Sequence, residues 1–124
     1  MDFNFAASMP LQETFTQAVF GQVANMTGFI TGLALYNPGQ NDTDITIEVI
    51  SAGGEMVGQS IQPLGAGLRL SKLVPELVPT SEGQVGGYIR IRSDQPVIGQ
   101  LLFGALGFNG IPTFFSAVPP TVIQ

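Results

Sequence analysis

The chain has 124 residues, 44% of them hydrophobic and 10% charged, which fits a single domain built around one packed core. It contains no Cys and no His, so disulfides, thiol nucleophiles, imidazole bases and thiolate or imidazole zinc sites are excluded. Four Lys and Arg against nine Asp and Glu give a formal net charge of −5, which argues against a basic surface that binds nucleic acid or anionic lipid.

Helical periodicity is nearly absent, whereas short runs of β-branched and aromatic residues recur between Gly, Pro, Asn and Asp. Residues 1–13 are interpreted as an N-terminal segment, or as the last strand of a preceding repeat, and residues 14–124 as one domain. Within this domain the runs predict strands at Phe15–Phe20, Phe29–Tyr36, Ile45–Ile50, Met56–Ile61, a short stretch from Leu68, Gly87–Ser93, Val97–Leu106 and Ile111–Val118.

The segments between these strands carry the residues that turns require. Asn37–Asp42 contains Pro and Gly, and Ser51–Gly54 is expected to close a hairpin between its two flanking strands. Ser93–Pro96 predicts a tight turn, and Leu73–Leu77 predicts one helical turn and no more.

Seven or eight short strands with frequent turns predict an all-β domain, either a two-sheet sandwich or a barrel. In Ile45–Ile50, apolar residues alternate with polar ones, so we expect one buried face and a wet face that carries Glu48. The most apolar window, Val97–Phe108, is too short to span a bilayer, and no membrane insertion is expected.

The two ends of the chain resemble each other. Phe5–Pro10 can be laid over Phe114–Pro119, with Phe and Pro coinciding and small residues matching small ones. Six positions are few, and chance is the alternative explanation. A true repeat would mean the tail of one unit followed by a complete second unit, as in a tandem array.

Three longer segments resemble a family of repeat domains in large exported bacterial proteins. Phe29–Pro38 reads FITGLALYNP, similar to the family's TGLALVNP strand, and Ile45–Gly54 reads ITIEVISAGG, similar to its TVTLELYDASG hairpin. Gly87–Gly99 reads GYIRIRSDQPVIG, similar to its GYIRVTSDxPVxG strand pair, and Val118-Pro119 matches its closing VP. The resemblance implies a two-sheet immunoglobulin-like β-sandwich in a secreted or surface-anchored protein, and it carries no catalytic residues.

Asn41, Asp42 and Asp44 are the candidate metal ligands. Amide and carboxylate oxygens suit calcium, but a calcium site needs about six or more oxygens and this loop offers few. The favoured interpretation is a solvated turn in which Asn and Asp side chains bind their own backbone. No other cofactor is expected.

No residue is identified as catalytic, and the chain is not expected to be an enzyme. Asp42-Thr43-Asp44 lacks the Gly that follows Asp-Thr in an aspartic protease signature, and no spacing selects a pair of carboxylates. Gly83–Gly87 is rich in glycine but precedes a strand, whereas a phosphate-binding loop needs a following helix.

Tyr88, Arg90 and Arg92 share one strand face by alternation, and some topologies would bring Tyr36 beside them. Aromatic and guanidinium groups are favoured contact residues, so these four form the candidate surface for a glycan or protein ligand. The alternative, which we favour, is an ordinary solvated sheet face.

The leading prediction is a non-catalytic structural or spacer module of an extracellular or cell-surface protein, with the periplasm as an alternative location. Residues 14–41 and 95–124 carry no charge, so the expected partners are neighbouring copies, in the same chain or in a homo-oligomer, or other domains of the parent protein. Two alternatives stay open: a glycan- or protein-binding module, and a subunit that associates by β-strand pairing or exchange.

Overall fold

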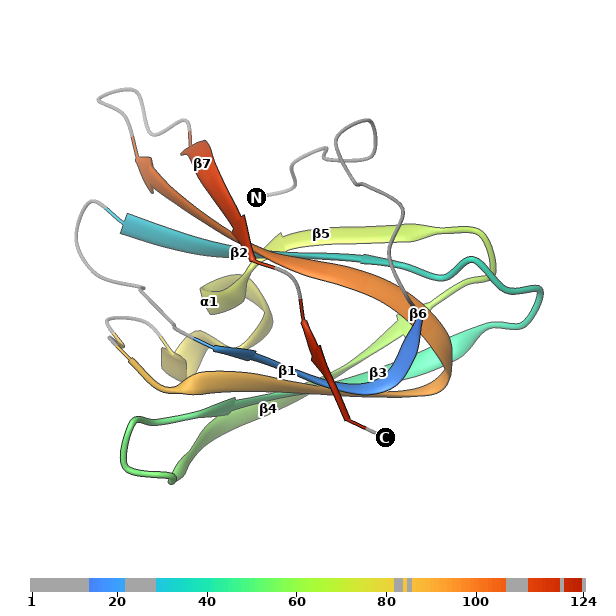
Figure 1. Ribbon diagram of the computed structural model, residues 1–124, viewed down its shortest axis with the longest axis horizontal. Helices are drawn as coiled ribbons and strands as arrows, with labels where there is room; N and C mark the ends of the chain where they lie inside the picture. Colours follow the sequence, from blue (N-terminus) through green and yellow to red (C-terminus); the bar gives the residue numbers. More distant parts are fainter. Residues whose placement is uncertain are drawn as a thin grey trace.

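The computed structural model describes residues 14–21, 29–81, 84, 86–106, 112–118 and 120–123. It consists almost entirely of β-strands (Figure 1), which confirms the predicted all-β class. The elements in chain order are β1 (Phe15–Gly21), β2 (Phe29–Tyr36), β3 (Thr43–Ile50), β4 (Met56–Leu64), β5 (Arg69–Leu73), α1 (Val74–Leu77), the 3-10 turn η1 (Pro79–Ser81), β6 (Tyr88–Leu106), β7 (Pro112–Val118) and β8 (Thr121–Val122).

Every strand pair is antiparallel, and β6 connects two groups of strands. One group has the order β4-β3-β6-β1-β8, and in the other β2 pairs with β5 and β6, while β7 pairs with β6. The first half of β6 lies between β3 and β1. Its second half pairs with β2 from Ile98 onward and lies between β2 and β7 from Leu101 onward. Figure 1 shows β6 curving from the lower group to the upper one.

The predicted tight turn at Ser93–Pro96 is wrong, because β6 runs without interruption through 19 residues. The chain bends here instead: Phe15 of β1 pairs with Val97, whereas Gln17 pairs with Arg92. Polar side chains hold the bend. The Gln95 amide donates to Thr43 Oγ1 at 3.0 Å, and the Ser93 hydroxyl donates to the Gln95 carbonyl at 2.7 Å.

The hydrophobic core lies between the two groups of strands. Ile45, Ile47 and Val49 of β3 are fully buried, as are Ile89 and Ile91 of β6, so the predicted buried face is confirmed on both strands. The predicted wet face of β3 is wrong at Glu48 and Ile50, which are buried as well. The core also takes in residues from β1, β2 and the helical turn: Phe15, Ala18, Phe20, Leu33, Leu35, Val74 and Leu77.

A single helical turn, as predicted, follows β5. Val74 and Leu77 of α1 are buried, and the Leu73 N–H donates to the Glu76 carboxylate at 3.1 Å. The turn α1 contacts β2, and η1 contacts β4, so this segment packs between the two groups of strands at one side (Figure 1). No helix in the described part of the chain has the length and apolar character needed to cross a bilayer.

Part of the repeat prediction lies outside the described residues. Residues 1–13 are among those not described, and the division into an N-terminal segment and one domain therefore stays a prediction. Phe114 lies on β7, where the backbone is described.

Candidate functional site

Three charged side chains meet on the outer face of the strand group that contains β3 and β6. Glu48 of β3 lies opposite Arg90 of β6, and Thr46 lies opposite Arg92. Arg90 donates from Nε and Nη2 to the two carboxylate oxygens of Glu48, at 3.0 and 3.1 Å. Arg92 Nη2 lies 3.1 Å from Glu48 Oε1. We call these three residues the Glu48 network.

Within the Glu48 network the carboxylate is buried, whereas the two arginine side chains are partly exposed. The Glu48 side chain is 4% exposed, whereas those of Arg90 and Arg92 are 39% and 51% exposed. A buried carboxylate is costly unless charged partners bind it. The two parallel hydrogen bonds from Arg90 to Glu48 are the strongest arrangement for such a pair. The sheet therefore uses two of the five N–H donors of Arg90 to neutralise its own buried acid.

The same contacts set the ionisation of the network. The hydrogen bond from Arg90 holds the pKa of the Glu48 carboxyl below its ordinary value; burial opposes this, and the charges of Arg90 and Arg92 add to it. In return, the Glu48 carboxylate raises the pKa of Arg90. Glu48 and Arg90 therefore stabilise each other's charged forms at neutral pH.

The mutation Glu48→Gln is expected to destabilise the fold at pH 7 by about 1–2 kcal/mol, after allowing for the solvent exposure of the two guanidinium groups. Because the folded-state pKa is lowered, this stabilisation is present above the ordinary carboxyl pKa and is lost as pH falls through the folded value. Urea unfolding at pH 7 and pH 3 measures the difference. The control is Glu55→Gln, at an exposed turn position; an equal loss from this mutation would contradict a specific role for Glu48.

Of the four predicted ligand-contact residues, the structure places three on one strand and the fourth elsewhere. Tyr88, Arg90 and Arg92 alternate along β6, and Tyr88 is half-buried. Tyr36 lies on β2, opposite Ile98 and therefore beyond the bend of β6. Its ring is covered by the Arg69 guanidinium, 4.6 Å from the ring centroid.

Sequence reasoning missed that Glu48 joins these arginines. It put Glu48 on a solvated face, and the face is right, but the carboxylate is buried under the arginine side chains. The available signal was one acid and two bases on the outward faces of two strands. It indicates an ion pair only once β3 and β6 are known to be neighbours.

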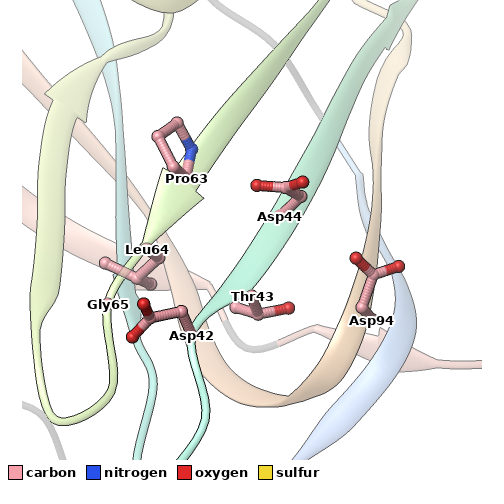
Figure 2. A pocket seen from close by; sticks show the side chains of 7 residues that line it. All are labelled: Asp42, Thr43, Asp44, Pro63, Leu64, Gly65 and Asp94. Carbon is pink, nitrogen blue, oxygen red and sulfur yellow. The ribbon is translucent and has the colours of Figure 1, made fainter.

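A pocket of about 350 Å³ opens at the end of the same face (Figure 2). Its lining includes two of the predicted metal ligands, Asp42 and Asp44, together with Asp94 of β6, but not Asn41. Figure 2 shows the three carboxylates set apart and aimed in different directions. Within the described ranges, no three acidic side chains lie close enough together to hold a metal ion. The calcium site stays a prediction.

The candidate metal-binding loop has structural contacts of its own. Asp42 Oδ1 accepts the Ala66 N–H at 3.0 Å, which ties this loop to the turn after β4. The main-chain oxygen of Asn41 accepts a hydrogen bond from Asn37 Nδ2 at 2.8 Å. These contacts agree with the favoured interpretation of the loop as a turn whose polar side chains bind main-chain groups, except that Asp42 binds the main chain of another turn.

Asn37 is a second residue whose role the sequence did not indicate. It is fully buried, and its Nδ2 donates to the carbonyls of Asn41 and Leu64 at 2.8 and 3.2 Å. Its Oδ1 accepts the Gly39 N–H at 3.0 Å. The side chain therefore joins its own turn to the end of β4.

No protein-family model matches the chain, and no curated protein sequence matches it significantly. Among solved structures, Thermotoga maritima 1070 is similar with a TM-score of 0.73 and 16% identity, covering 88% of this chain and 95% of that one. The Anabaena sensory rhodopsin transducer is similar with a TM-score of 0.60 and 18% identity, covering 73% and 98%. Both likenesses are at the level of fold.

A third solved structure is more distant. FlgD from Xanthomonas campestris, whose structure was described in relation to hook capping in flagellar assembly, has a TM-score of 0.38 and 15% identity. The match covers 86% of this chain and 70% of the FlgD chain.

Proposed function

We propose that this chain is a non-catalytic structural module, an immunoglobulin-like β-sandwich that spaces or joins parts of an extracellular or cell-surface protein. The observation that carries the proposal is the Glu48 network. Arg90 and Arg92, the cations of the predicted ligand-contact face, are bound to a buried carboxylate of their own sheet. The charged side chains of this face therefore stabilise the domain itself.

The path of β6 supports the same proposal. This strand pairs with β1 and β3 in one group and with β2 and β7 in the other. One continuous strand therefore ties both groups together, and the bend between them is held by Thr43 and Ser93. Such a connection suits a domain that must hold its shape between neighbours.

A second candidate function is binding of an acidic glycan or protein group to the Tyr88–Arg92 face. Arg92 favours it, because its side chain is 51% exposed and gives only Nη2 to Glu48. A guanidinium has five N–H donors, so Arg92 keeps donors for a carboxylate ligand while Glu48 fixes its orientation.

The test is retention of the purified chain on insoluble polysaccharides, cell walls and matrix proteins, with calcium and with EDTA. The structural module predicts no retention on any material. Retention that Arg92→Ala abolishes, while the melting temperature changes by only a few degrees, would overturn the proposal in favour of the binding module. Calcium-dependent retention that the Asp42→Asn/Asp44→Asn double variant abolishes would overturn it in favour of a calcium-dependent binder.

A further inference from the structure

In the part of the chain that the structure describes, the strand β4 forms an open edge. There it ends the order β4-β3-β6-β1-β8 and pairs with β3 alone. Among the described residues, no hydrogen bond between two main-chain groups involves Met56–Leu64 outside the β3–β4 pair, although the Leu64 carbonyl accepts the Asn37 side chain. An edge strand presents N–H and C=O groups that can pair with another strand.

β4 contains one protective residue, Pro63, but it lacks the charged side chains that protect other edges. Its nine residues carry no charge, and Ile61 and Met56 are 62% and 49% exposed. The other edges whose side chains are described differ from it. β5 carries Arg69 and Lys72, and β8 has only two residues. Charged and very short edge strands resist pairing, so β4 is the edge best suited to it.

Pro63 identifies which residues of β4 face outward along the edge. Proline has no N–H, so in an edge strand it takes a position whose N–H would point away from the neighbouring strand. In an antiparallel pair this direction alternates along the strand. Ile61 and Gln59, at two-residue spacing from Pro63, therefore also direct their main-chain groups away from β3.

We propose that β4 pairs with β4 of a second copy, antiparallel and about a two-fold axis at Ser60. Gln59 and Ile61 of each copy then exchange four main-chain hydrogen bonds with Ile61 and Gln59 of the other. Gly58 lies opposite Gln62, and the Val78 and Thr80 side chains already fill the space beside Gly58, so the Gln59 and Ile61 pairs make the central contact. The exposed Ile61 side chain packs against Gln59 of the second copy.

Charge favours a second copy as the occupant of this edge. Each chain has a formal net charge of −5, so two copies repel each other, and this repulsion is weakest where they meet on an uncharged surface. Like charges opposite each other destabilise a strand pair, and β4 paired with itself brings no charges together. The result is one continuous sheet across both molecules.

Sedimentation velocity over a concentration series tests this pairing. The chain is expected to dimerise with rising concentration, and Ile61→Lys, which puts a charge on the seam, is expected to weaken dimerisation at least about tenfold. Thr121→Lys places the same charge on β8, the opposite edge of the same group, and is expected to dimerise like the parent. Melting temperatures check that both variants fold.

Hydrogen exchange of the main-chain amides gives a second readout. The Gln59 and Ile61 amides are expected to gain protection as the dimer forms. A chain that stays monomeric up to about 1 mM, or a dimer that Thr121→Lys breaks and Ile61→Lys spares, would overturn the inference. The inference rests on the proposed function, because it names a second copy of the chain as the neighbour of the structural module. A monomer with no retention on the binding panel overturns only the inference, whereas retention by a dimer overturns only the proposed function.

Discussion

Replacing Gly87 with Ala is expected to lower the free energy of unfolding by about 3 kcal/mol or more. Gly87 has φ +87°, and a Cβ there would meet the Ile50 carbonyl oxygen and lie 2.8 Å from Gln84 Nε2 and 2.9 Å from the Ser51 carbonyl carbon. The carbonyl oxygen and carbon belong to the backbone at the end of β3, which cannot move without disturbing its pairing with β6. Urea unfolding of the variant and the parent measures the loss.

Gly86→Ala is the matched control for this prediction. Gly86 has φ +85°, nearly the same positive φ, but among the described residues a Cβ there would meet only the Ala52 Cβ, at an ordinary 3.5 Å. Its expected cost is therefore that of the left-handed backbone alone, about 1–2 kcal/mol. Equal losses at the two positions would show that the Ile50 carbonyl does not restrict Gly87.

Local pattern was enough to predict most strands of this fold. The alternation in β3 and in the first half of β6 marked the buried face correctly, because a half-buried strand repeats every two residues. The helical turn α1 was likewise predictable from Pro75 and its apolar neighbours. Leu68 was predicted on a strand, but it precedes β5 and is 60% exposed, because the chain is still turning there.

The bend of β6 could not be predicted because its cause is distant in the sequence. Ser93–Pro96 has the composition of a turn, and local rules favour one. Thr43, about fifty residues earlier, accepts the Gln95 amide and keeps the strand continuous. The bend also determines which residues share the candidate ligand-binding face, because Ile98 and its partner Tyr36 lie beyond the bend from Tyr88.

Burial of polar groups was the other feature that sequence reasoning missed. Glu48 and Asn37 are residue types expected at the surface, and their neighbours in the sequence give no reason to bury them. Their partners decide otherwise: arginines of β6 surround Glu48, and main-chain groups of two turns surround Asn37. Such partners become known only with the strand order.

Asn37→Ala is expected to lower the free energy of unfolding by about 2–4 kcal/mol, because it leaves three main-chain groups without their partner. The carbonyls of Asn41 and Leu64 lose the Nδ2 donor, and the Gly39 N–H loses its acceptor. The main-chain bonds of Asn37 itself, from its N–H to the Leu68 carbonyl and from the Gly67 N–H to its own carbonyl, remain. Unfolding by urea and by heat measures the effect.

Asn41→Ala, in the same turn, is the matched control. It distinguishes the role of the Asn37 side chain from a general sensitivity of the turn to substitution. Asn41 is exposed and gives the Asn37 amide only its main-chain oxygen, which Ala retains, so Asn41→Ala is expected to cost no more than about 0.5 kcal/mol. Asn37→Asp keeps an acceptor for Gly39 but supplies no donor and buries a charge, and it is expected to be at least as harmful as Asn37→Ala. If Asn41→Ala proved as costly as Asn37→Ala, the turn as a whole would be the sensitive element. If both were neutral, the bonds from Asn37 would contribute nothing measurable to holding this turn against the end of β4.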